Sequence, residues 1–529
     1  MKFIKSLFVD LPLTDRVLRI TGCILAFIQI VITIVFSIHF GGLGLLAGSF
    51  KALIIVALFL VALLVFVTQY WRIPGIIFKV ISVILSVVMV VGSIYLHSTN
   101  KSLGEMTSGT TKTSTIGIYV LKDSSINDVN GLNGLALGIS TSNGRKPSET
   151  VAETLKDEKG IGFELKSYTG VDLLVGGLYS GEVSAIIFDE SFTAIVETVY
   201  PDFLTEARSI YTQKVTEYIQ YTTDENGTKK DSTATDDTED ETDEFDKPIV
   251  IEPPLIRPVV NTEAPTDSKI YTFYFSGVDV YGSPKENRNS DVNIICVINL
   301  NTHQILLLNT PRDYYLDTTV SAYSGLKDKL THAGCYGIDC SVGTLEWFYG
   351  IDINYYFKIN FTGFVNIINE LGGVNVYSEY EFDAQGYHFN QGYNQLDGEA
   401  ALAFSRERYS FASGDNQRGK NQMAVITAII NKMTSSTAIL TNYVNIMSAI
   451  SGSVVTDMTI NDMATMMSMI DHGELSSFTV TSYAVSGSGA DLMCYSLSSP
   501  NYMMIPDQNT VNQALVRLWT IYTNQIIDF

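Results

Sequence analysis

Three apolar runs dominate the first hundred residues of the chain. They cover Ile20–Phe40, Ala52–Tyr70 and Val80–Leu96, and none of them contains Lys, Arg, Asp or Glu. Each is close to the ~20 residues that a helix needs to cross a bilayer. One such run would also suit a buried helix or a signal peptide. Three in succession, with no small-residue cleavage site after the first, predict a membrane anchor of three spans within residues 1–100.

The basic residues near these runs set the predicted orientation. They precede the first run or separate the second from the third, as Lys2, Lys5, Arg16, Arg19, Arg72 and Lys79. The loop between the first and second runs has only Lys51. Because cytoplasmic loops carry an excess of Lys and Arg, the N-terminus is expected in the cytoplasm. Three spans then place the chain beyond about Leu96 outside the cell, in a multi-pass protein of the cell membrane.

Residues 114–220 show short apolar runs that alternate with helical patterns. The runs IGIYVL, LALGIS and SAIIFDE read as strands, and Pro147–Glu158 and Val171–Ser180 read as helices. This alternation predicts a small α/β domain. The segments SSINDVNGLNGLALGI and LLVGGLYSGEVSAIIFDE resemble one lobe of a solute-binding protein. A single lobe lacks the second wall of a cleft, so we expect an accessory packing or partner-binding role.

An acidic and proline-rich stretch occupies residues 222–267. Asp224–Asp246 contains eleven acidic residues against Lys229 and Lys230, and the prolines run from Pro248 to Pro265. Dense like charge with few aromatics is typical of a solvated, disordered linker, which we favour over a calcium site. The net charge of the whole chain is −22. That charge disfavours nucleic acid as a partner.

The polar pattern of residues 268–435 predicts a charged site at one sheet edge. Tyr271–Asp279, Asp291–Leu300 and Ile305–Asp313 read as strands, with the tetrapeptide NTHQ as the second turn. In an antiparallel meander, Asp279 ends one strand where Asp291 begins the next. Counting back from the NTHQ turn places Arg312 and Asp313 opposite Asp291.

A second group of charged residues follows in the same region. If Leu402–Phe411 is an extended strand, Arg406 and Arg408 point to one face, because side chains alternate along a strand. Arg418 in GDNQRGKNQ would lie just before or inside the first turn of the next helix, where anions bind favourably. Taken singly, each of these residues is more typical of a solvated surface. Together, four arginines and two aspartates that can gather at one place favour a phosphate-binding site.

Two of the five cysteines lie close together in the sequence. Cys335 and Cys340 in HAGCYGIDCS would form either a disulfide or two free thiols in an extracytoplasmic domain. His332 is nearby, but a metal site would need more ligands than this histidine.

Several motifs in order resemble the catalytic domain of the LytR–CpsA–Psr family. They are NRNSDVNIICVINLNTHQILLLNTPRDYY, DKLTHAGCYGID, INYYFKINFTGFVNIINELGGVNVY and YNQLDGEAALAFSRERYSFASGDNQRGKNQ. The likeness covers roughly Lys269–Lys432, which is far more specific than a short pattern. It implies an α/β fold in which a mixed central sheet is flanked by helices and holds a polyprenyl chain in an apolar channel.

The resemblance also implies roles for individual residues. Two aspartates would bind Mg²⁺ or Mn²⁺, and arginines would bind the pyrophosphate and act in catalysis. The implied metal ligands are Asp279 and Asp291, and the implied pyrophosphate ligands are Arg312, Arg406, Arg408, Arg418 and Gln422. Asp313 and Asp415 would be supporting or catalytic groups. Where the family commonly has an arginine, this chain has Asn289, and Arg288 would substitute for it.

The implied function is transfer of an anionic glycopolymer, such as a teichoic acid or capsule, from a polyprenyl pyrophosphate lipid to peptidoglycan. The acceptor would be the 6-hydroxyl of N-acetylmuramic acid. Two alternatives stay open: a hydrolase that uses water as acceptor, and a non-catalytic envelope sensor. Residues 436–529 are expected to form a C-terminal extension with helical patches at Asn461–Ile470 and Gln513–Ile526, and they carry no motif of known chemistry.

Overall fold

The computed structural model describes residues 12–41, 48–68, 71–106, 111–140, 145–218, 221–223, 229–231, 269–278, 283–321, 324–435, 452–459, 462 and 478–527. The chain forms two compact units. The helical unit comprises Met1–Glu105, Asn442–Ser451 and Thr459–Met469. The α/β unit comprises Met106–Thr441, Gly452–Met458 and Ile470–Phe529.

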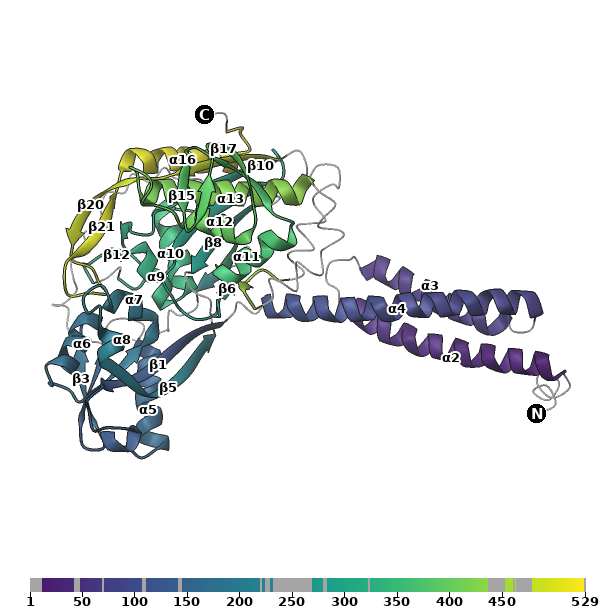
Figure 1. Ribbon diagram of the computed structural model, residues 1–529, viewed down its shortest axis with the longest axis horizontal. Helices are drawn as coiled ribbons and strands as arrows, with labels where there is room; N and C mark the ends of the chain where they lie inside the picture. The colour runs from purple at the N-terminus through teal and green to yellow at the C-terminus, as the bar shows by residue number, and fades with distance from the viewer. Residues whose placement is uncertain are drawn as a thin grey trace. The chain divides into compact units, whose positions relative to one another are not determined.

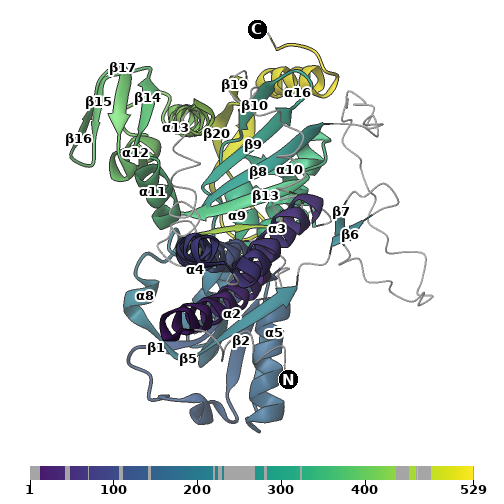
Figure 2. The same cartoon turned by 90° about the vertical axis from the view of Figure 1, so that its right-hand side faces the viewer.

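Three apolar helices make up most of the described part of the helical unit, side by side in Figures 1 and 2. They are α2 (Leu13–Gly41), α3 (Gly48–Val67) and α4 (Arg72–Met106). Among the described residues, Leu13–Gly41 and Arg72–His97 are long and apolar enough to cross a membrane, whereas the apolar part of α3, Lys51–Val67, is shorter. Large apolar side chains on these helices point outward, which suits a lipid environment. The two longer helices therefore favour membrane anchoring.

The first part of the α/β unit is a small domain, here called the N-terminal domain. Its elements are β1 (Thr111–Leu121), β2 (Ala136–Ser140), α5 (Arg145–Glu153), β3 (Glu164–Tyr168), α6 (Val171–Tyr179), β4 (Ala185–Asp189), α7 (Thr193–Val196), α8 (Phe203–Glu206) and β5 (Ala207–Tyr218). They form a mixed sheet in the order β3-β2-β4-β1-β5. Alternate residues of β1 enter the core because strand side chains alternate between two faces. The predicted α/β alternation is confirmed.

Most of the acidic linker lies outside the described residues. Its described parts are the paired strands β6 (Tyr221–Thr223) and β7 (Lys229–Asp231).

A six-stranded mixed sheet forms the centre of the larger domain. Its strands are β8 (Ile270–Val278), β9 (Val292–Asn299), β10 (Gln304–Asn309), β13 (Tyr355–Asn360), β18 (Val454–Thr456) and β19 (Thr479–Ala484). The order is β18-β13-β8-β9-β10-β19, and Figure 2 shows the inner strands in a row. The antiparallel pairs β8–β9 and β9–β10 confirm the predicted meander.

Both edge strands of this sheet come from the segment predicted to be an extension. β18 pairs antiparallel with β13, and β19 pairs parallel with β10. The central sheet therefore extends past the predicted domain boundary at residue 435, because these strands of the expected C-terminal extension complete it. The helix expected at Gln513–Ile526 is present as α16 (Gln508–Tyr522), whereas Asn461–Ile470 lies outside the described residues except for Asp462.

Helices pack on one face of the sheet in a continuous apolar core. They are α9 (Leu330–Tyr336), α10 (Ile338–Tyr349) and α16. Tyr274, Ile295 and Leu306 of the sheet share this core with Leu345 and Leu518 of the helices. The small pairs β11 (Tyr315–Leu316) with β12 (Asp328–Lys329), and β20 (Gly487–Leu492) with β21 (Asn501–Pro506), border the same region.

A lobe with its own core follows β13. It contains α11 (Phe361–Glu370), β14 (Val374–Ser378), β15 (Phe382–Ala384), β16 (Tyr387–Phe389), β17 (Gly392–Leu396), α12 (Gly398–Arg406) and α13 (Asp415–Ser435). The strand predicted at Leu402–Phe411 is wrong, because α12 occupies its first half. Asp397 caps this helix by accepting a hydrogen bond of 2.9 Å from Ala400 N, and the alanine-rich run that follows favours helix.

The N-terminal domain and the larger domain share a core. Val175 and Phe188 of the former pack in one cluster with Ala333, Tyr336 and Leu497 of the latter. This contact fits the expected packing role of the accessory domain.

Candidate active site

The end of the β8–β9–β10 meander brings together the first charged residues. Asp291 directly precedes β9, and Arg312 follows β10 beyond the pair of Asn309 with Ile294. Arg312 Nη1 donates a hydrogen bond of 2.6 Å to Asp291 Oδ1. Arg312 Nε also lies 3.8 Å from Asp313 Oδ2. The convergence predicted by counting from the turn is confirmed.

A second charged pair lies at the start of α13. The helix begins at Asp415, so Arg418 lies in its first turn, where it forms an ion pair with Asp415. Burial raises the pKa of Asp415, while Arg418 lowers it and Asp313 raises it again. Burial lowers the pKa of Arg418, and Arg312 lowers it further while Asp415 raises it. Asp313 and Arg312 thus act electrostatically on Asp415 and Arg418, so we treat the two ion pairs as one group. We call Asp291, Arg312, Asp313, Asp415 and Arg418 the charged cluster.

Lys329 is a neighbour of the cluster that the sequence analysis missed. Its Nζ lies 3.5 Å from Asp313 Oδ1 and donates a hydrogen bond of 3.4 Å to Asn501 Oδ1. The side chain is largely buried, so a lysine here needs such oxygen partners. The motif DKLTHAG contained this residue, but only the fold brings it to Asp313 and to β21.

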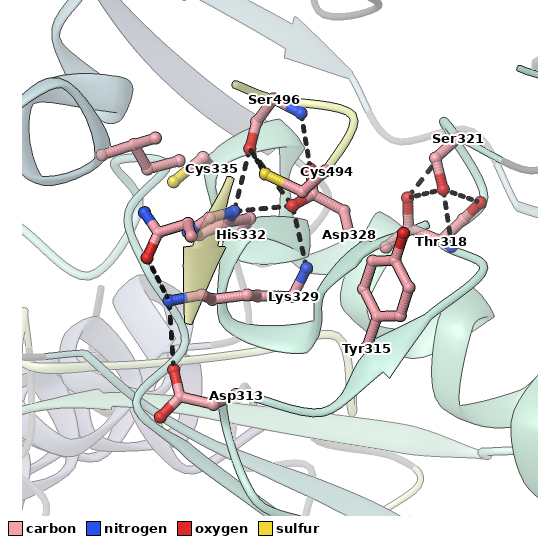
Figure 3. A network of polar contacts seen from close by, with 12 residues as sticks. Asp313, Tyr315, Thr318, Ser321, Asp328, Lys329, His332, Cys335, Cys494 and Ser496 are labelled. Carbon is pink, nitrogen blue, oxygen red and sulfur yellow. Dashed lines mark hydrogen bonds and ion pairs between the residues drawn. The ribbon is translucent and has the colours of Figure 1, made fainter. Parts of the chain in front are cut away.

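A buried network supports the backbone at Lys329 (Figure 3). Asp328 accepts hydrogen bonds from Lys329 N at 2.8 Å, His332 Nδ1 at 2.7 Å, and Ser496 N and Oγ at 3.0 and 3.1 Å. Potential metal-ligand atoms of Asp328, His332 and Cys494 all lie within 4.8 Å of one another. Because hydrogen bonds already engage both oxygens of the carboxylate, we interpret the network as a support for Lys329.

The two arginines of the RER segment have different surroundings. The Arg406 guanidinium stacks over the ring of Phe361 at 4.5 Å, which is a cation–π contact. Arg408 lies beyond the end of α12, and its charge lowers the pKa of both Asp415 and Arg418. The structure thus brings Arg408 to the charged cluster and places Arg406 on an aromatic side chain.

Two further predicted pyrophosphate ligands contact other protein groups. Arg288 Nη1 donates to the Glu190 carbonyl at 3.3 Å, and its Nη2 pairs with Glu286 at 3.3 Å. Arg288 therefore joins the larger domain to the N-terminal domain. Gln422 is buried, and its Nε2 donates to the Ser405 carbonyl at 3.4 Å, which links α13 to α12.

The oxygen atoms at the sheet edge suit a hard divalent cation. Asp279, one of the two predicted metal ligands, lies outside the described residues. Asp291 and Asp313 offer carboxylate oxygens beside Arg312. Such ligands suit Mg²⁺ or Mn²⁺, so the donor set agrees with the expected ion.

Cys335 and Cys340 are buried free thiols, so the disulfide alternative is wrong and the free-thiol alternative holds in this structure. Cys335 Sγ donates to Asn289 Oδ1 at 2.8 Å, and Thr319 Oγ1 donates to Cys340 Sγ at 3.2 Å. Burial raises the pKa of Cys340 to about 11, which keeps this thiol protonated and unreactive.

Known proteins resemble about a third of the chain at the sequence level. A polyisoprenyl-teichoic acid–peptidoglycan teichoic acid transferase TagU of Enterococcus faecalis is 36% identical over 179 residues, which are 34% of this chain and 58% of the relative. A protein with the same name from Bacillus cereus is 36% identical over 188 residues, 35% of this chain and 60% of the relative. The chain thus spans about 60% of the length of these curated relatives.

Solved structures and the family comparison extend over more of the chain. The crystal structure of B. subtilis TagV covers 49% of this chain and 99% of its own, at 25% identity and a TM-score of 0.41. The LytR_cpsA_psr family matches residues 218–513, which is more than half of the chain. This match includes the charged cluster, Lys329 and both edge strands of the central sheet. The chain belongs to the LytR–CpsA–Psr family.

Proposed function

We propose that this protein is a phosphotransferase that moves an anionic glycopolymer from a polyprenyl pyrophosphate lipid onto peptidoglycan. The observation that carries the proposal is the charged cluster, in which Arg312 and Arg418 are held by carboxylates at one sheet edge beside Lys329. Family membership and the printed names of the curated relatives support the same reaction class.

The reaction forms and breaks one bond to phosphorus. The acceptor hydroxyl, which we assign to the 6-hydroxyl of N-acetylmuramic acid, attacks the phosphorus that carries the glycopolymer. The P–O bond to the polyprenyl phosphate breaks, and this lipid monophosphate leaves. The product is a phosphodiester between the glycopolymer and peptidoglycan. The hydroxyl proton goes to Asp415, whose raised pKa makes it a better proton acceptor than an ordinary aspartate.

The cationic side chains bind the pyrophosphate and stabilise the charge that develops on it. Arg312, Arg408 and Arg418 supply planar guanidinium donors, which match phosphate oxygens in pairs. Lys329 adds a point charge beside Asp313, with its Nζ nearest the carboxylate oxygen that Arg312 does not face. Because aspartates hold Arg312 and Arg418 in place before substrate binds, little reorganisation is needed at the moment of reaction. Arg406, which stacks on the ring of Phe361, would contribute to the same phosphate site, as the family resemblance implies.

Asp279 and Asp291 would hold Mg²⁺ or Mn²⁺, with Asp313 close by. When bound, this ion would neutralise part of the pyrophosphate charge.

An aromatic stripe on the central sheet supports a polyprenyl site. The Phe273 ring lies 5.9 Å from Tyr355 and 6.0 Å from Phe357, and Phe357 lies 5.8 Å from Phe275. These side chains alternate along β8 and β13 with those of the opposite, helix-covered face. An isoprenoid chain needs such an apolar surface.

The helical unit would hold the enzyme at its lipid substrate. We propose that α2, α3 and α4 are three spans, with the N-terminus in the cytoplasm and the α/β unit outside the cell.

Native mass spectrometry of the full chain in detergent tests the lipid site. Bound polyprenyl phosphate or pyrophosphate should be present in the unaltered protein and lost in an Arg312→Ala, Arg406→Ala double variant. Arg517→Ala is a matched control, because Arg517 also stacks on a ring, Tyr483, at 4.0 Å. Retention of lipid by the double variant would contradict the proposed phosphate site.

A transfer assay tests the reaction itself. Labelled lipid-linked glycopolymer should become attached to peptidoglycan, and an Asp291→Ala variant should lose this transfer. Release of lipid phosphate at an equal rate without peptidoglycan, with no attached product, would instead identify a hydrolase.

A further inference from the structure

The outward face of the antiparallel strand pair β14–β17 combines two tyrosines with two amides. Tyr377 and Tyr393 are directly opposite each other in the strand register, and Asn375 is opposite Gln395. All four side chains are exposed, and the tyrosines are 52% and 72% exposed. We call these four residues the tyrosine face.

The fold holds this face in a fixed position. The alternate residues Val374, Val376 and Leu396 point to the other side and pack in a core with Val425 and Ala428 of α13. In Figure 2 the β14–β17 strand pair and the β15–β16 hairpin lie on the outer side of the lobe that contains α12 and α13. The tyrosine rings also contact each other at 5.3 Å in an edge arrangement. Each ring therefore packs against the other on the exposed face of the strand pair.

The residues that follow β14 lie near the loop and the helix that carry part of the charged cluster, as Glu379 pairs with Lys420 of α13. Tyr380 follows β14, and its ring lies 5.9 Å from Phe411 in the loop between α12 and α13. In the same loop, Arg408 Nη2 donates a hydrogen bond of 2.6 Å to the hydroxyl of Tyr409, which is 84% exposed. Arg408 in turn acts on Asp415 of the cluster. Exposed tyrosines thus lie on β14 and β17, just after β14, and in the loop before α13.

The composition of this surface favours an uncharged glycan. Aromatic rings offer flat apolar faces to the C–H side of sugar rings, and amides of Asn and Gln can both donate to and accept from hydroxyl pairs. We propose that the tyrosine face binds the glycan strand of the acceptor peptidoglycan, an inference that rests on the proposed transferase function.

Charge distinguishes the acceptor strand from the anionic donor polymer. Residues 374–405 contain five acidic residues and no Lys or Arg. Lys420 pairs with Glu379 at 3.3 Å, and His388 lies 2.9 Å from Asp383 and 3.7 Å from Glu381, so two cationic partners face three of these five acids. A polyanion would be repelled from this net negative surface, whereas a neutral chain of N-acetylated sugars would not.

A binding experiment tests the face independently of transfer. The full chain in detergent is titrated with chitohexaose, a neutral β-1,4-linked N-acetylglucosamine oligomer, and separately with poly(glycerol phosphate). We expect a Tyr377→Ala, Tyr393→Ala double variant to bind chitohexaose about tenfold more weakly. The matched Tyr377→Phe, Tyr393→Phe variant keeps the rings and should bind normally. Thermal unfolding of each variant checks that the lobe remains folded.

The outcomes separate this inference from the proposed function. Equal chitohexaose binding by the folded alanine variant, no binding by the unaltered protein, or preferential binding of poly(glycerol phosphate) would overturn the inference. In the transfer assay, the alanine variant should raise the KM for uncrosslinked peptidoglycan strands. Normal transfer with an unchanged KM would overturn the tyrosine face but leave the transferase standing. If the unaltered protein shows ring-dependent chitohexaose binding but no transfer, the tyrosine face would stand and the proposed transferase function would be overturned.

Discussion

Replacing Arg312 should affect both the stability of the α/β unit and its activity. Arg312 makes one charge-assisted hydrogen bond of 2.6 Å to Asp291, and the two side chains are only 25% and 18% exposed. Hydrogen bonds to charged groups contribute about 1.5–3 kcal/mol, and removal of one partner leaves the other charge poorly solvated. An Arg312→Met variant, which keeps much of the apolar volume, should therefore lose about 2 kcal/mol. For a domain of about 150–250 residues, a loss of about 2 kcal/mol corresponds to a decrease in Tm of roughly 4–8 °C.

The same substitution should reduce glycopolymer transfer by ~10³-fold or more, as expected for an arginine that stabilises a transferring phosphate. A double-mutant cycle with Asp291→Asn isolates the pair, and its coupling energy in thermal unfolding should be about 1–2 kcal/mol. Arg517→Met serves as the control for loss of an arginine elsewhere. A coupling energy near zero, or transfer within tenfold of the unaltered protein, would refute the reasoning.

Three further perturbations follow from described contacts. Lys329→Ala should lower transfer by about 10–100-fold because Asp313 loses a cation, while Lys329→Arg should retain part of it; a normal rate in the alanine variant would exclude the role of this lysine. Asp397→Ala removes the N-cap of α12 and should destabilise the lobe by about 1 kcal/mol in thermal unfolding, with Asp397→Asn nearly neutral; equal losses in both would argue against capping. Burial raises the pKa of Glu346 from 4.5 to about 7, so the folded state binds more protons and stability should decrease as pH rises from about 4.5 to 7. Glu346→Gln should flatten that slope in unfolding measured across this pH range, and an unchanged slope would contradict the assignment.

Local patterns were sufficient for much of the fold. The alternation in Asp291–Leu300 and Ile305–Asp313, with a turn between them, predicted the meander and the contact of Arg312 with Asp291. The RER segment shows where such reasoning failed. Period-two spacing of Arg406 and Arg408 predicts a strand, although Asp397 and the alanine-rich run after it are a helix start. The capping residue and the helix propensity of the run decide the local structure, because the two arginines lie at and beyond the end of α12.

The sequence by itself determined the apolar helices, the α/β alternation and the pairing at the end of the meander, because these depend on residues close together in the chain. Only the tertiary structure decided which distant segments meet. β18 and β19 are short strands at the sheet edges, so their own patterns are weak and their positions depend on pairing with β13 and β10. Lys329 lies beside Asp313 partly because its backbone N–H donates to Asp328. Asp328 is in turn held by a hydrogen bond from Ser496, far along the chain. Such contacts depend on packing across the whole domain, which no local periodicity records.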